Sequence, residues 1–280
     1  MKRIFAFFAI LSFVAISCNK DNIQQNIMSA PEEIVITVDG GSLDADVMTK
    51  TTAVSSVPSS LYMAGSTGSG SSQSSKWAST SKSVSSGKMT TGYYQTASAT
   101  AYNYYLSNVN MNFTSSGFTI VADGSTIDAI AGVTMASNST APSVAMNHIF
   151  ARLGSLSCSS SNGYSLSGVT YKLKSKDSTT GTKGTYNIAT GAWSSTTTLS
   201  EQTVTSSSDL YLVPGTYTLT VSGTESLGDY SHTFSASTDV TLTGGKINAI
   251  AAKRTGTGAQ GITVSVTLAS WGSTTLTPSI

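Results

Sequence analysis

Apolar and polar residues alternate along much of the chain, in short runs separated by glycine and proline. A period of two puts every second side chain on the same face of a strand, so each run predicts a half-buried β-strand. The clearest runs have their apolar residues at Ile34, Ile36 and Val38; Val169, Tyr171 and Leu173; Tyr217, Leu219 and Val221; and Ile262, Val264, Val266 and Leu268. Short strands between frequent turns favour an all-β sandwich, and no segment after residue 18 shows a sustained helical period.

Three segments modify this pattern. Gly244-Gly245 follows an alternating run and predicts a hairpin turn. Residues 55–88 are rich in serine and glycine, and their low-complexity centre at 65–72 predicts a mobile loop or a poorly ordered surface. The segment Tyr93 to Tyr105 holds five tyrosines, for which packing in the core and across strands is favoured over a binding face.

The first hydrophobic run is typical of an export signal. Lys2 and Arg3 precede an apolar stretch that ends in small residues and Cys18. This pattern predicts a lipoprotein signal at 1–17, lipidation of Cys18 and a tether at 18–32 that holds the chain to a bacterial envelope membrane. An uncleaved transmembrane anchor is disfavoured because the run has about 14 residues, against the roughly 20 that span a bilayer. An ordinary signal peptide with an incidental cysteine is the other alternative.

Composition and motifs argue against nucleic-acid binding and against catalysis. Charged residues make up 10% of the chain and the net charge is +1, so no basic field would attract nucleic acid. The two histidines stand far apart, and neither HExxH, CxxC nor GxSxG occurs. Gly256 to Gly261 fits GxGxxG but precedes a predicted strand rather than a helix, which disfavours a dinucleotide site. We expect no enzyme activity, no metal and no cofactor.

Two further residues are candidates for covalent chemistry. Cys158 has no disulfide partner if Cys18 is acylated, and a buried thiol is favoured over a reactive one. Asp177-Ser178-Thr179 resembles an acceptor triplet for O-glycosylation in envelope proteins of Bacteroidales, which makes Ser178 a candidate site. An ordinary polar turn after a strand is the favoured interpretation of this triplet.

Several motifs, in this order along the chain, resemble the fimbrillin family of Bacteroidales. They lie between Ile127 and Trp271, about half of the chain. The motifs are residues 127–131, an apolar strand at 144–153 with His148, Ala151 and Arg152, the stretch Gly184-Thr185-Tyr186 to Trp193, residues 213–217, residues 242–246 and the terminal strand that runs into Trp271. The resemblance implies two tandem transthyretin-like β-sandwich domains, which we place at 33–141 and 142–280. It also implies a fimbrial subunit or fimbria-associated lipoprotein of the outer membrane, acting in cell adhesion.

In that family, a surface protease removes the first strand, and a strand of a neighbouring subunit fills the groove. Here the removable strand would be Ile34 to Val38, the donor would be a C-terminal segment such as Ser265 to Ile280, and the partners would be other fimbrial subunits. The only arginines are Arg3, Arg152 and Arg254, so none lies just after the first strand, and Lys50 is the candidate for cleavage. If the strand stays, the protein would be a membrane-bound anchor or terminator.

A surface glycan-binding lipoprotein is the alternative function. In that case Trp77, Tyr102, Tyr104 or Trp193 would stack on sugar rings, and exposure of these aromatic side chains on one face would support the alternative.

Overall fold

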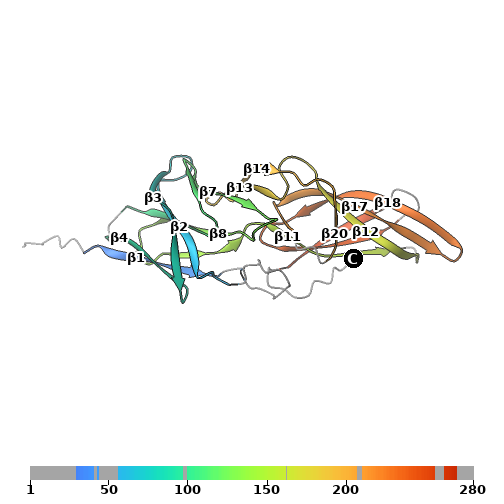
Figure 1. Cartoon of the computed structure of the whole chain (residues 1–280), viewed down its shortest axis with the longest axis horizontal. Helices are drawn as coiled ribbons and strands as arrows, with labels where there is room; N and C mark the ends of the chain where they lie inside the picture. The colour runs from blue at the N-terminus through green and yellow to red at the C-terminus, as the bar shows by residue number, and fades with distance from the viewer. Residues whose placement is uncertain are drawn as a thin grey trace, which may run out of the picture. The chain divides into compact units, whose positions relative to one another are not determined.

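The computed structural model describes residues 30–40, 43, 56–96, 100–161, 163–206, 210–255 and 262–269. Within these ranges the chain forms twenty β-strands and no helix, which confirms the all-β prediction (Figure 1). The residues from Pro31 onward form one compact unit. Cys18, Lys50, the glycine-rich loop at 256–261 and the last eleven residues lie outside the described ranges.

The largest sheet contains the first strand of the chain. Its order is β10 (Asn147–His148), β8 (Ile130–Ser137), β5 (Tyr102–Ser107), β2 (Ser60–Thr67), β3 (Ser74–Ser85), β4 (Lys88–Gln95), β1 (Glu32–Asp39), β9 (Ser143–Ala145). The two outermost strands of this order, β9 and β10, are separated by Met146 alone, so the sheet curls until its ends meet around an apolar core.

A four-stranded sheet joins residues from distant parts of the sequence. Its order is β14 (Trp193–Thr197), β13 (Lys183–Asn187), β7 (Gly117–Asp123), β6 (Asn112–Thr114). β13 pairs antiparallel with β7, with Lys183 opposite Asp123. Thus β13 and β14 lie after the predicted domain boundary at 141/142 but complete a sheet begun before it. The boundary and the tandem transthyretin-like domains stay predictions.

Two more sheets enclose an apolar cluster that is separate from the core of the curled sheet and includes the buried residues Leu173, Leu219 and Ile250. One has the order β16 (Tyr211–Leu212), β11 (Ala151–Ser160), β19 (Ile247–Arg254), β20 (Ile262–Ala269). The other has the order β15 (Gln202–Val204), β12 (Ser165–Ser175), β17 (Gly215–Leu227), β18 (Tyr230–Leu242). In β17 the side chains of Tyr217, Leu219 and Val221 are buried, as the alternation predicts.

The predicted hairpin turn at Gly244-Gly245 is wrong. It connects β18 to β19, and these strands belong to different sheets. Gly245 has a φ of +65°, and a Cβ on Gly244 would lie 2.7 Å from Cγ of Pro214. The two glycines therefore allow the chain to pass close to Pro214 as it connects one sheet to the other, and they do not form a hairpin turn.

The prediction of a loose loop at 65–72 is also wrong in part, because Gly65, Ser66 and Thr67 belong to β2. A Cβ on Gly65 would lie 2.1 Å from Cε3 of Trp77, so the missing side chain makes room for the indole. Buried Gln73 accepts hydrogen bonds from the hydroxyls of Ser66 and Tyr105, each at 2.6 Å. Packing and buried hydrogen bonds thus order a segment whose composition alone is typical of a loop.

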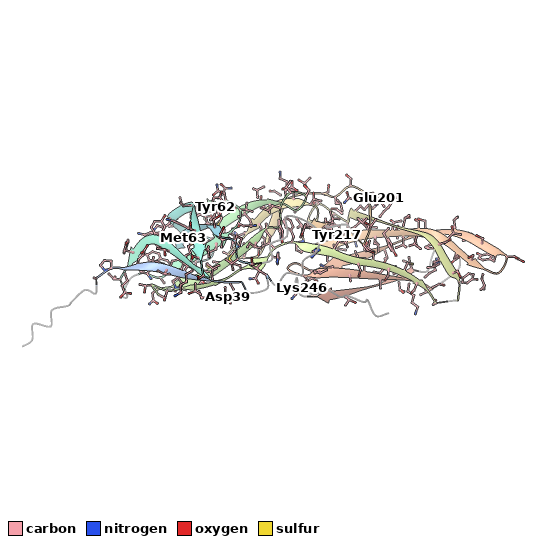
Figure 2. All side chains as sticks on the ribbon, turned by 60° about the horizontal axis from the view of Figure 1, so that its bottom comes forward. Asp39, Tyr62, Met63, Glu201, Tyr217 and Lys246 are labelled. Atoms are coloured by element: carbon pink, nitrogen blue, oxygen red, sulfur yellow. The ribbon has the colours of Figure 1, made fainter. Side chains whose placement is uncertain are left out.

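The tyrosines between 93 and 105 mostly pack inside the protein, as the favoured interpretation predicts. β2 and β5 have apolar clusters on both faces. Tyr104 lies in the core of the curled sheet, and Tyr105 lies in a separate apolar cluster on the other face of these strands. Both side chains are completely buried, whereas Tyr94 is exposed. Met63 and Tyr62, labelled in Figure 2, are neighbours on β2 that belong to these two different clusters.

Candidate functional site

The first strand is the candidate functional element, and it is bonded along both edges. β1 pairs antiparallel with β4, where Ile36 lies opposite Met89, and parallel with β9, where Thr37 lies opposite Ser143. The amide of Thr37 donates to the carbonyl of Pro142 at 2.8 Å, and the carbonyl of Asp39, labelled in Figure 2, accepts from the amide of Met146 at 2.9 Å. β1 is therefore an interior strand of the sheet, although it comes first in the described chain.

Side chains of β1 form part of the core of the curled sheet. Ile34, Ile36 and Val38 are 0%, 0% and 4% exposed. Their neighbours in the cluster include Leu61, Met63, Met89, Leu106 and Val144. Burying one such aliphatic side chain contributes about 1.5–3 kcal/mol, so the three together contribute about 5–9 kcal/mol. The space that β1 fills is thus an apolar groove with hydrogen-bonding strand edges on both sides.

Just beyond β1, the structure describes Gly40 and Leu43. The amide of Leu43 donates to the carbonyl of Gly40 at 2.8 Å, and the Leu43 side chain is 2% exposed. The described chain resumes at Ser56, so the connection to β2 that includes Lys50 lies outside the described residues. Cleavage at Lys50 and lipidation of Cys18 stay predictions.

Part of the predicted donor segment has a partner within the same chain. Residues 265–269 belong to β20, which pairs with β19 from Arg254 opposite Ile262 to Ile247 opposite Ala269. β20 is the outermost strand of its sheet. If residues 265–269 served as a donor strand, they would first have to leave β19; residues 270–280 lie outside the described ranges.

Ser178 lies in an exposed turn after β12. The carboxylate of Asp177 accepts hydrogen bonds from the hydroxyl of Thr179 at 2.5 Å and from its amide at 2.8 Å, and both contacts lower the pKa of Asp177. The hydroxyl of Thr196 donates to the carbonyl of Ser178. This geometry fits the favoured interpretation of a polar turn, and O-glycosylation of Ser178 stays a prediction.

The aromatic residues of the glycan-binding alternative make ring contacts with other aromatic residues. Trp77 is half-buried and stacks on Tyr93 with ring centroids 4.7 Å apart. Trp193 is half-buried and contacts the ring of Phe150 at 5.1 Å. Burial raises the pKa of Tyr104 to about 12. These positions count against stacking of Trp77, Tyr104 and Trp193 on a sugar.

The other residues with possible chemistry are dispersed. His148 forms a buried pair with Asp128, with Nδ1 and Oδ1 3.0 Å apart, whereas His232 is exposed on β18. The described residues contain no group of three His, Cys, Asp or Glu side chains that could hold a metal ion. Nor does any helix in these ranges have the length and apolarity to cross a membrane. Cys158 is half-buried rather than fully buried, and burial raises the pKa of its thiol.

A buried ion pair that the sequence analysis did not identify lies inside the sandwich that contains β17. Glu225 Oε2 accepts from Arg254 Nε at 3.1 Å, and both side chains are 1% exposed. The alternation of β17 contained the signal: Glu225 continues the inward-facing series of Tyr217, Leu219 and Val221. An acid at an inward position predicts a buried basic partner.

Comparison with known proteins identifies relatives in fold. No family model matches the chain, and no curated protein matches it. A solved structure of a proposed cell adhesion protein from Parabacteroides distasonis is 11% identical with a TM-score of 0.51, covering 88% of this chain and 98% of that one. A second proposed cell adhesion protein from the same species is 9% identical with a TM-score of 0.50, covering 86% and 100%. This chain therefore shares its all-β fold with these two proteins over nearly their whole length.

Proposed function

We propose that the protein is a structural subunit or anchor of surface fimbriae, that it assembles by β-strand addition, and that it acts in cell adhesion without catalysis. The observation that carries this proposal is the position of β1. It is the first strand of the described chain, it lies between β4 and β9, and it buries Ile34, Ile36 and Val38.

Removal of such a strand would leave a groove of matching chemistry. The edges of β4 and β9 would offer backbone donors and acceptors, and the floor would accept alternate aliphatic side chains. A strand from another fimbrial subunit with apolar residues at every second position would fit this groove. The shared fold with proposed cell adhesion proteins and the fimbrillin-like motifs support the same function.

Lipidation of Cys18 would hold the protein at the outer membrane, facing the outside. A cut near Lys50 would then release both the lipid and β1, which gives a polymerising pilin. Without the cut the groove stays filled, and the protein would serve as an anchor at the membrane. The two roles therefore differ in the N-terminus of the protein found in fibres.

The test is N-terminal sequencing of the protein in purified fibres, with electron microscopy of cells that lack it. A start at Thr51 supports the pilin, and a start at Cys18 supports the anchor. The variant Lys50→Gln should keep the start at Cys18, whereas the matched variant Lys88→Gln, at an exposed lysine of β4, should behave as wild type. Fibres that lack the protein, together with unchanged fibres on deletion cells, would refute both roles.

A further inference from the structure

Two strand connections meet at one end of the sheets formed by β11, β12, β17 and β18. Ser160 ends β11 and Ser165 begins β12, where it lies opposite Ser226 of β17. β17 and β18 run side by side to a tight turn, at which Leu227 lies opposite Tyr230 (Figure 1). We name Tyr164 together with Leu227–His232 the hairpin tip. The register of the strands places both parts of the hairpin tip at the same end.

The hairpin tip exposes apolar and aromatic side chains. Leu227 is 54% exposed and Tyr230 is 45% exposed. The ring of Tyr230 meets that of Tyr164 edge-on, with centroids 5.8 Å apart, and lies nearly parallel to that of His232 at 6.3 Å. Gly228 adopts a φ of +58°, which allows the two-residue turn. The rings therefore contact one another while the central one, Tyr230, remains open to solvent.

A buried ion pair holds the strands directly beneath the hairpin tip. Glu225 lies two residues before Leu227, and it accepts from Arg254 Nε at 3.1 Å and from Nη2 at 3.4 Å. The guanidinium also lies over the ring of Phe234 on β18, 5.0 Å from its centroid. Two hydrogen bonds from a planar guanidinium to one carboxylate fix the relative orientation of the two side chains in addition to the attraction between their charges. This contact joins β17, β18 and β19 and gives the exposed rings a rigid base.

We infer that the hairpin tip binds a neutral glycan, with Tyr230 as the platform for a sugar ring. The apolar face of a hexose packs on an aromatic ring. The hydroxyls of Tyr164 and Ser231 and the carboxylate of Asp229 would form hydrogen bonds with the hydroxyl groups of the sugar. Asp229 is the one acidic residue at the tip, and no lysine or arginine belongs to the tip as defined. An anionic polysaccharide would therefore meet the Asp229 carboxylate and find no lysine or arginine there.

The size of the surface favours a glycan over a protein. A standard protein interface takes about 20–30 residues from each partner, and the hairpin tip supplies far fewer. One or two aromatic side chains are enough to cover a sugar ring. The site differs from the aromatic residues named in the sequence analysis, because those are buried or half-buried whereas Tyr230 is exposed. The hairpin tip is also independent of β1, so it lies outside the proposed assembly function.

The test measures binding of the purified full-length protein to immobilised neutral polysaccharides (mannan, galactan and β-glucan), with alginate as the acidic probe. We expect binding to at least one neutral polysaccharide and none to alginate. Tyr230→Ala should weaken the binding at least tenfold. The matched control Tyr94→Ala removes a tyrosine that is 62% exposed on β4 and should change it less than twofold.

A second variant separates recognition from folding. Asp229→Asn keeps the turn and the rings but removes the carboxylate charge, and we expect it to weaken binding severalfold with an unchanged melting temperature. Binding to none of the neutral polysaccharides, equal binding by Tyr230→Ala and wild type, preference for alginate, or self-association through the tip would overturn the inference. Because a protein that never polymerises could still bind glycan through the tip, failure here is distinguishable from failure of the fimbrial role.

Discussion

Replacing Ile36 by alanine tests whether β1 is an energetic part of the core. Ile36 is 0% exposed and lies opposite Met89, which is also fully buried. The substitution removes three carbon atoms, and at about 0.8 kcal/mol per buried methylene the lost transfer free energy is about 2.4 kcal/mol. The cavity adds to this loss, and measured isoleucine-to-alanine changes in cores fall at about 2–5 kcal/mol. We expect the free energy of unfolding to fall by about 3–4 kcal/mol.

Urea unfolding followed by tryptophan fluorescence measures this change, because Trp77 packs against the same cluster. The midpoint should fall by about 1 M or more at an unchanged slope. Thr37→Ala is the matched control: Thr37 is the next residue of β1 and is exposed, so its loss should stay near 0.5 kcal/mol. A loss below about 1 kcal/mol for Ile36→Ala, or equal losses for both variants, would contradict the buried role of β1.

Two further predictions concern residues whose surroundings are tightly packed. Glu225→Gln removes one charge of a buried ion pair and should destabilise the protein by about 3 kcal/mol. Glu201→Gln, in a half-exposed surface pair, should cost less than about 1 kcal/mol. Equal urea midpoints for the two variants would rule out a stabilising role of the buried pair. Gly65→Ala would place a Cβ 2.1 Å from the ring of Trp77 and should lower the free energy of unfolding by about 1–3 kcal/mol. In the control Gly40→Ala, the nearest atom to the new Cβ is 3.7 Å away, so thermal unfolding should be nearly unchanged. A melting temperature unchanged by Gly65→Ala would contradict the close packing.

Local alternation predicted several of the twenty described strands but not their partners. The residues of β1, β12, β17 and β20 could be assigned because a period of two places apolar side chains on one face. The segment 65–72 could not be assigned, because its order depends on Trp77 and Gln73 reaching it across a turn. Glycine and serine are typical of loops. Here, however, Gly65 leaves room for the indole of Trp77, and Ser66 donates a buried hydrogen bond to Gln73.

The candidate site, too, could be predicted from the sequence only in part. The sequence pointed to the first strand through Ile34, Ile36 and Val38, and these residues lie in the core. Its position between β4 and β9 could not be predicted, since β9 lies about a hundred residues away in the chain. The hairpin tip was missed because Tyr164 and Tyr230 become neighbours only when β12 pairs with β17.

By itself, the sequence determined the all-β class, the inward and outward faces of the main strands, and the low charge of the chain. Those properties depend on side-chain period and composition, which are local. The tertiary structure alone decided the pairing of β13 with β7, the crossing at Gly244-Gly245 from one sheet to another, and the burial of Glu225 against Arg254. Each of these depends on contacts between residues far apart in sequence, and a strand pattern indicates which face is buried but not which strand lies beside it.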